Sequence, residues 1–230
     1  MIRKRLTEAE WVASRSSYLM LPSIRRTIVN DPRKGRLFAV ACCYRIWHLL
    51  ADQGSRAAVE TSELYADGRA TWDQLRAAHD EAGSAHADAF QSKGKVGASA
   101  EWAAQFSASP TAWFAATRAS MFAYLAAGDR GLKEAPEQAV QARLLRCIFG
   151  PLPFRPVSLD ASCVTPPITE LAQSIYDERT FERMPKLADT LEQAGCTNVD
   201  VLNHCRCTGP HVRGCWVLDL LLAKRKLVPV

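Results

Sequence analysis

The segment 36–50 constrains the fold more than any other part of the sequence. It reads Arg-Leu-Phe-Ala-Val-Ala-Cys-Cys-Tyr-Arg-Ile-Trp-His-Leu-Leu and is apolar on almost every side when placed on a helix. A helix that is apolar all round lies inside a protein. Only Arg45 and His48, one turn apart, are polar in its interior, and we expect them to face a carboxylate of another helix. The sequence therefore predicts a central buried helix that other helices surround.

Helical patterns fill most of the remaining sequence. Thr7 and Glu10 form a capping-box pattern, and Trp11 opens the apolar face of a first helix. Ala-rich or amphipathic helical stretches follow at residues 55–66, 71–91, 110–127 and 134–149. Because these stretches contain few β-branched residues, they favour close helix packing over a sheet. No strand pattern is visible, so the predicted fold is all-α, a compact multi-helix bundle.

A proline-rich connector divides the chain. Residues 150–167 contain prolines at positions 151, 153, 156, 166 and 167, which predicts an extended segment. We therefore expect an N-terminal helical domain over 1–149 and a smaller C-terminal helical subdomain over 168–230 packed on the first. The subdomain is predicted to hold four helices, at residues 168–176, 185–194, 198–206 and from 208 to about 224.

Composition limits the classes of protein to consider. The chain has 230 residues, of which 48% are hydrophobic and 23% charged, enough apolar material for a core without disulfides or a metal. No apolar leader follows the basic start, and the longest apolar run, at 217–223, is too short to span a bilayer. We therefore expect a cytoplasmic protein without a membrane partner, whose eight cysteines are reduced thiols.

Charge is distributed unevenly along the chain. Residues 1–50 have a net charge of +7, residues 51–205 of −6 and residues 206–230 of +4. Basic ends could bind an anionic partner such as nucleic acid. We favour pairing between the three regions within the fold, because the basic residues are scattered along the chain.

Cysteine and histidine are concentrated near the C-terminus. Six potential metal ligands occur within 20 residues: Cys196, His204, Cys205, Cys207, His211 and Cys215. Zinc takes four nitrogen or sulfur ligands. Cys207, His211 and Cys215, completed by Cys205 or by His204, would supply them, with His211 and Cys215 on one helix face. No CxxC pair is present, and buried thiols often only pack. We therefore expect packed thiols and no cofactor, with zinc at Cys205, Cys207, His211 and Cys215 as the alternative.

The same cluster offers a possible thiol nucleophile. Cys205 or Cys207 near His211 would need a third residue to orient the imidazole, and the sequence shows none. Phosphate-binding, dinucleotide-binding, zinc-protease and serine-hydrolase motifs are also missing from the sequence. We therefore assign no catalytic residue and expect that the protein is not an enzyme.

Several motifs together resemble a known family. They are Phe149-Gly150, Phe154-Arg155-Pro156-Val157, Ile175-Tyr176-Asp177-Glu178-Arg179, Leu187-Ala188-Asp189, His204-Cys205-Arg206 and Gly209-Pro210-His211-Val212-Arg213-Gly214-Cys215-Trp216. With segment 36–50, they resemble a family of small uncharacterised all-helical proteins abundant in planctomycete bacteria. The resemblance covers most of the chain and implies a helical, bacterial protein but no particular activity.

Three hypotheses for function follow. The first is a non-enzymatic interaction module, an adaptor or accessory subunit, that binds a protein partner between its N-terminal helices and residues 168–224, with the helix at 212–224 as contact element. The second is an accessory subunit that binds nucleic acid through basic residues near its N-terminus. Those residues are Arg3, Lys4, Arg5, Arg25, Arg26, Arg33, Lys34 and Arg36. The third is the zinc or thiol site at 196–215.

Overall fold

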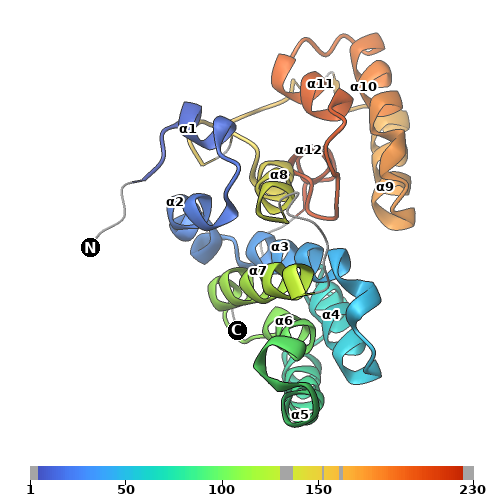
Figure 1. Cartoon of the computed structure of the whole chain (residues 1–230). Helices are drawn as coiled ribbons and strands as arrows, with labels where there is room; N and C mark the ends of the chain where they lie inside the picture. Colours follow the sequence, from blue (N-terminus) through green and yellow to red (C-terminus); the bar gives the residue numbers. More distant parts are fainter. Residues whose placement is uncertain (1–4, 130–136, 152, 161–162, 225–230) are drawn as a thin grey trace. The chain divides into compact units, whose positions relative to one another are not determined.

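The computed structural model describes residues 5–129, 137–151, 153–160 and 163–224, without the side chains of residues 93, 95–97 and 129. Within these ranges the chain forms twelve α-helices and no β-strand (Figure 1). The predicted all-α fold is therefore confirmed. No helix in the described ranges is long and apolar enough to cross a membrane.

The chain divides into two compact units, one reaching to residue 142 and the other covering 143–225. This division lies inside helix α8, earlier than the boundary at 149 expected from the prolines. The N-terminal unit contains α1 (Glu8–Ala13), α2 (Ser17–Asn30), α3 (Pro32–Arg45), α4 (Gln53–Ala66), α5 (Trp72–Gly97), α6 (Ser99–Ser107), α7 (Ala112–Asp129) and the start of α8 (Glu137–Phe149). The C-terminal unit contains the rest of α8 with α9 (Pro166–Glu178), α10 (Met184–Gln193), α11 (Val199–Arg206) and α12 (Trp216–Leu221).

Helix α3 is the centre of the N-terminal unit. Pro32 occupies its first turn, where a missing N–H costs nothing, and every residue from Arg33 to Cys43 is buried. The buried helix predicted at 36–50 is therefore present, although it ends at Arg45 and continues as a 3-10 turn over Trp47–Leu49. Arg45 meets the expected carboxylate, because its Nε lies 2.8 Å from Oε2 of Glu137.

Small residues allow the helices around α3 to approach closely. Helix α7 packs against both α3 and α6, and its alanines, among them Ala115, Ala116 and Ala119, are fully buried. At Gly35 an added Cβ would lie 2.5 Å from Cγ2 of Ile28, so α2 and α3 cross where no larger residue fits unless Ile28 moves. The Ala-rich sequence therefore determines the tight packing of this unit.

The chain around residue 94 differs from its prediction. The predicted helix at 71–91 is longer in the structure, where α5 continues to Gly97 with a break at Gly94, whose φ is +73°. The short helix α6 that follows was not predicted. Its Ala100, Ala103 and Ala104 are buried.

The C-terminal unit has its own core. The predicted apolar stripe of α9, including Ile168, Ala172 and Ile175, packs with apolar residues of α10, α11 and α12. The last helix is shorter than expected: it begins at Trp216, and residues 207–215 before it are irregular. Its Trp216, Val217, Leu218 and Leu221 belong to this core, so the apolar side of the helix that we expected as contact element is buried.

Candidate metal centre

Helix α8 supplies the first residue of a cluster of thiols and imidazoles in the C-terminal unit. Cys147 lies in the last turn of α8 and is 2% exposed. Gly150 ends the helix in the left-handed conformation, with φ +52°, and its N–H donates to the carbonyl of Arg146 at 2.8 Å. A non-glycine residue would resist this conformation, so Gly150 fixes the end of the helix that carries Cys147.

Helix α11 supplies the second residue, His204, in its last turn. Asn198 caps the helix, since its side chain accepts a hydrogen bond from the N–H of Val201. Near the same end, Arg155 of the connector pairs with Asp200 through two bonds of 2.6 and 2.8 Å. Two bonds in parallel fix the orientation of the pair, although its half-exposed position limits its energy.

The irregular segment 207–215 supplies the third and fourth residues, His211 and Cys215. A turn closes this segment, because the N–H of Cys215 donates to the carbonyl of Val212 at 3.0 Å. Gly214 inside the turn has φ +83°. His211 and Cys215 therefore come together through a turn and not through the shared helix face that we expected.

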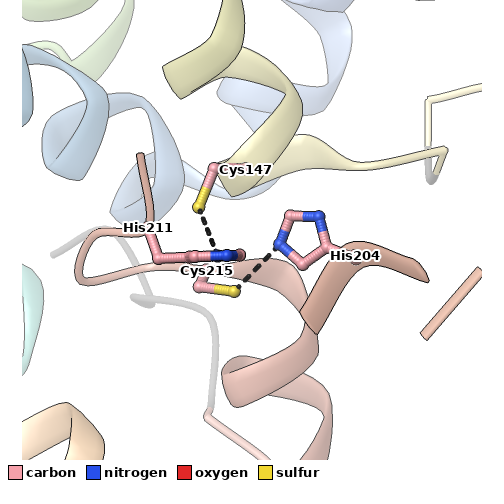
Figure 2. A group of neighbouring side chains, drawn as sticks. All are labelled: Cys147, His204, His211 and Cys215. Carbon is pink, nitrogen blue, oxygen red and sulfur yellow. Dashed lines mark hydrogen bonds between the residues drawn. The ribbon is translucent and has the colours of Figure 1, made fainter. Parts of the chain in front are cut away.

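The four side chains converge on one point (Figure 2). One donor atom from each of Cys147, His204, His211 and Cys215 lies within 4.8 Å of the donor atoms of the others. Nε2 of His204 is 3.2 Å from Sγ of Cys215, and Nδ1 of His211 is 3.9 Å from Sγ of Cys147. The two sulfurs are buried, and the imidazoles are half-buried.

Aromatic rings hold the imidazoles in place. The rings of His204 and His211 meet edge to face, with centroids 4.9 Å apart. Trp216, which is 2% exposed, has its ring centroid 5.3 Å from that of His204 and also lies against Gly150. An added Cβ on Gly150 would lie only 2.7 Å from the Trp216 ring, so the glycine makes room for the indole that supports His204.

The two thiols of the cluster have opposite pKa shifts. Burial raises the pKa of Cys147 well above that of an ordinary thiol, and its contact with Cys215 raises it further. Burial also acts to raise the pKa of Cys215, but the hydrogen bond from Cys147 and the contacts with His204 and His211 outweigh it and hold this pKa well below the ordinary value. These shifts favour the thiolate form at Cys215, the form that binds metal, with the Cys147 thiol donating to it.

The donor set fits a tetrahedral zinc ion. Two cysteines and two histidines form a common structural zinc site, with Zn–S near 2.3 Å and Zn–N near 2.0–2.1 Å. These lengths require donor atoms about 3.3–3.8 Å apart. The cluster, with all donor atoms within 4.8 Å of one another, would contract by about 1 Å at its widest. Two thiolates would also cancel the charge of Zn²⁺, so no net charge would be buried.

Cys207 lies at the margin of this cluster. Its exposed Sγ is 3.7 Å from Nε2 of His211, the ring nitrogen that faces away from Cys147. A metal-binding histidine usually contacts a further group through its second nitrogen, which fixes the orientation of the ring. Cys207 occupies that position for His211.

The structure brings together two of the four residues predicted as metal ligands. His211 and Cys215 are in the cluster, and Cys207 is beside it. Cys205 is fully buried in the core of the C-terminal unit, where burial raises the pKa of its thiol. His204, which the sequence offered as an alternative to Cys205, takes the position at the cluster.

Cys147 was missed by sequence reasoning. It lies far from the other ligands in the chain and on the same apolar face of its helix as Leu144 and Ile148. Its only sequence signal was a position one turn before the Gly150 that ends the helix. That signal describes the end of a helix and does not indicate a metal.

The basic residues proposed to contact nucleic acid do not share one surface. Arg33, Lys34 and Arg36 are buried, and Arg33 pairs with Asp67 at 3.1 Å. Arg5, Arg25 and Arg26 are exposed, whereas residues 3 and 4 lie outside the described ranges. A nucleic-acid surface on this unit would rest on the three exposed arginines.

Known proteins give no independent guide to this site. No model of a known protein family, no curated protein and no solved structure matches the chain. The assignment of the cluster therefore rests on its own geometry.

Proposed function

We propose that the C-terminal unit is a zinc-binding module in which Cys147, His204, His211 and Cys215 hold one Zn²⁺ with a structural role. The observation that carries this proposal is the convergence of four donor atoms from three separate parts of the chain. Four protein ligands fill the coordination sphere of zinc, whereas a catalytic site keeps one position open for water or substrate. Both sulfurs are buried, which also disfavours attack on a substrate.

The ion would join segments that otherwise depend on weak contacts. It would tie the end of α8 to α11 and to the irregular segment 207–215, which has few backbone hydrogen bonds of its own. Because the unit already has an apolar core around α9 and α10, zinc would add to an existing fold. Its contribution to the free energy of unfolding would grow with the free zinc concentration relative to the Kd.

Metal analysis of paired cysteine variants tests the proposal. The wild-type protein, purified without chelator, should contain about one zinc per chain, as expected for one four-ligand site. Cys215→Ala should lose the metal, and Cys205→Ala, which removes an equally buried thiol next to His204, should keep it. Wild-type protein that takes up no zinc, or equal metal content in the two variants, would contradict the proposal.

The partner-binding role has separate support in the N-terminal unit. Helices α2 and α7 border an apolar groove of about 450 Å³, lined by Tyr18, Leu21, Trp113, Phe114, Met121 and Tyr124 among others. On α7, Phe114, Met121 and Tyr124 are 38–44% exposed, so large apolar side chains face solvent along one side of the helix. Exposed apolar patches of this kind mark interaction sites in soluble proteins.

We propose that this groove binds an amphipathic helix with acidic flanks. Arg118 lies over the Phe114 ring at 5.1 Å and Arg25 over Trp113 at 5.6 Å, so cations border the apolar floor. None of the described lining residues is acidic. A helix with apolar residues on one face and carboxylates beside them matches both features.

Affinity capture with matched variants tests the groove. Met121→Asp should abolish capture of the partner, while Val199→Asp, an equally drastic change at an exposed position of the other unit, should leave it intact. An isolated acidic peptide with the sequence of the captured segment should compete with the partner for the groove. Failure of that peptide to compete, or equal capture by both variants, would refute this role, and self-association lost in Met121→Asp would assign the groove to a second copy of the chain.

A further inference from the structure

Arg36 is a buried cation without a carboxylate partner in the described part of the chain. It is 1% exposed, and its guanidinium donates only to main-chain carbonyls, those of Ser107, Ser109 and Pro110, at 2.9–3.3 Å. The Nε–H group has no hydrogen-bond partner among the described residues. Burial lowers the pKa of Arg36 to about 10, and only the interaction with Tyr65 acts in the opposite direction.

A neighbouring buried arginine, Arg33, does have a carboxylate partner. Arg33, one turn earlier on α3 and equally buried, pairs with Asp67 through Nε and Nη2. The carbonyls that Arg36 binds lie at and just after the C-terminus of α6, where the helix dipole gives partial negative charge. This arrangement connects α3 to the chain between α6 and α7, but it leaves a full positive charge without a counter-ion. Burying an ion without one is costly.

A cavity opens beside Arg36. Its volume is about 370 Å³, and its lining includes Arg36, Val29, Pro32, Tyr65, Trp72 and Trp113. The guanidinium lies 5.1 Å from the centre of the Tyr65 ring, and the Tyr65 and Trp72 rings are 6.2 Å apart. Small-molecule sites are usually apolar clefts of about 300–1,000 Å³ with a few placed polar groups, and this cavity has that composition.

We propose that this cavity binds a small aromatic monocarboxylate. The carboxylate would lie at the Arg36 end of the cavity and supply the counter-ion of Arg36, and the aromatic ring would lie among Tyr65, Trp72 and Trp113. A single buried cation calls for a single negative charge, because a second charge would be buried without a partner. Three large rings in the lining favour a planar aromatic body. This site is separate from the proposed zinc centre and does not depend on it.

Calorimetric titration of the full chain with indole-3-acetate and with its neutral analogue indole-3-acetamide tests the proposal. The acid should bind at least about tenfold more tightly than the amide, as expected for a charge-assisted hydrogen bond to a buried guanidinium. In Arg36→Met the preference should disappear. Equal affinity of the wild-type protein for the two ligands, or no binding of either, would overturn the proposal.

Two further measurements keep the test decisive if Arg36→Met does not fold. Trp72→Ala removes a ring that is 37% exposed, so it should leave the fold intact and weaken binding of the acid and of the amide. Unchanged binding in Trp72→Ala would place the ligand elsewhere and refute the site. A short peptide ending in Trp that binds more tightly than indole-3-acetate would assign the cavity to a protein C-terminus and overturn the small-molecule assignment.

Discussion

Replacing Gly150 with alanine tests how the end of α8 is joined to the metal centre. Gly150 has φ +52°, which costs a non-glycine residue about 1–2 kcal/mol. The new methyl group would also lie 2.7 Å from the Trp216 ring, whereas carbon atoms normally approach to about 3.5–4.0 Å. The ring would have to move by about 1 Å inside a packed core, and overpacking of this kind costs about 1–3 kcal/mol. The total predicted loss in the free energy of unfolding is about 2–5 kcal/mol.

Gly195→Ala is the matched control for this variant. Gly195 also has a positive φ, +88°, and lies in the same unit, but no atom lies within 4 Å of its added Cβ. The free energy of unfolding of Gly195→Ala should therefore fall only by the conformational cost, about 1–2 kcal/mol. Urea unfolding followed by circular dichroism gives both values.

The metal affinity of the two glycine variants provides a second readout. Trp216 supports His204, so Gly150→Ala should also bind zinc more weakly than Gly195→Ala does. Equal losses of stability in the two variants, together with unchanged zinc affinity, would refute the role given to Gly150 and Trp216.

Two further predictions concern single polar contacts. Burial raises the pKa of Glu137 despite its bond to Arg45, so the folded protein loses stability as the pH rises from the ordinary glutamate pKa through the raised one. In urea titrations, Glu137→Gln should therefore gain stability relative to wild type between about pH 4 and 7. A constant difference in stability across that range would contradict this prediction. Asn198→Ala should lower the free energy of unfolding by about 1 kcal/mol, because it removes the cap of α11. The same unfolding assay measures this loss, with Val199→Ala at an exposed position as control. An equal effect of the two changes would show that the cap does not stabilise the helix.

The sequence predicted the helical fold well because the fold depends on local patterns. The capping box at Thr7, the all-apolar segment in α3 and the stripe of α9 are each visible within a short window, and each is present in the structure. Segments with mixed signals were predicted less well. The break at Gly94 and the irregular segment before Trp216 are not marked by any hydrophobic periodicity in the sequence.

The metal centre was only partly predictable for the same reason. His211 and Cys215 were chosen because they are close in sequence, but their approach comes from a turn at Gly214. Sequence spacing cannot decide whether His204 or Cys205 is the metal ligand. The two residues are adjacent in α11 and point in different directions, His204 to the cluster and Cys205 to the core. Cys147 joins them only through the fold, because the core of the C-terminal unit brings the end of α8 beside α11.

X-ray absorption spectroscopy of the zinc-loaded protein tests the central claim most directly. The extended fine structure at the zinc edge should show two sulfur neighbours near 2.3 Å and two imidazole nitrogens near 2.0–2.1 Å, and Cys147→Ala should remove one of the sulfurs. A shell with three sulfurs, or one dominated by oxygen, would show that Cys147, His204, His211 and Cys215 are not the ligand set.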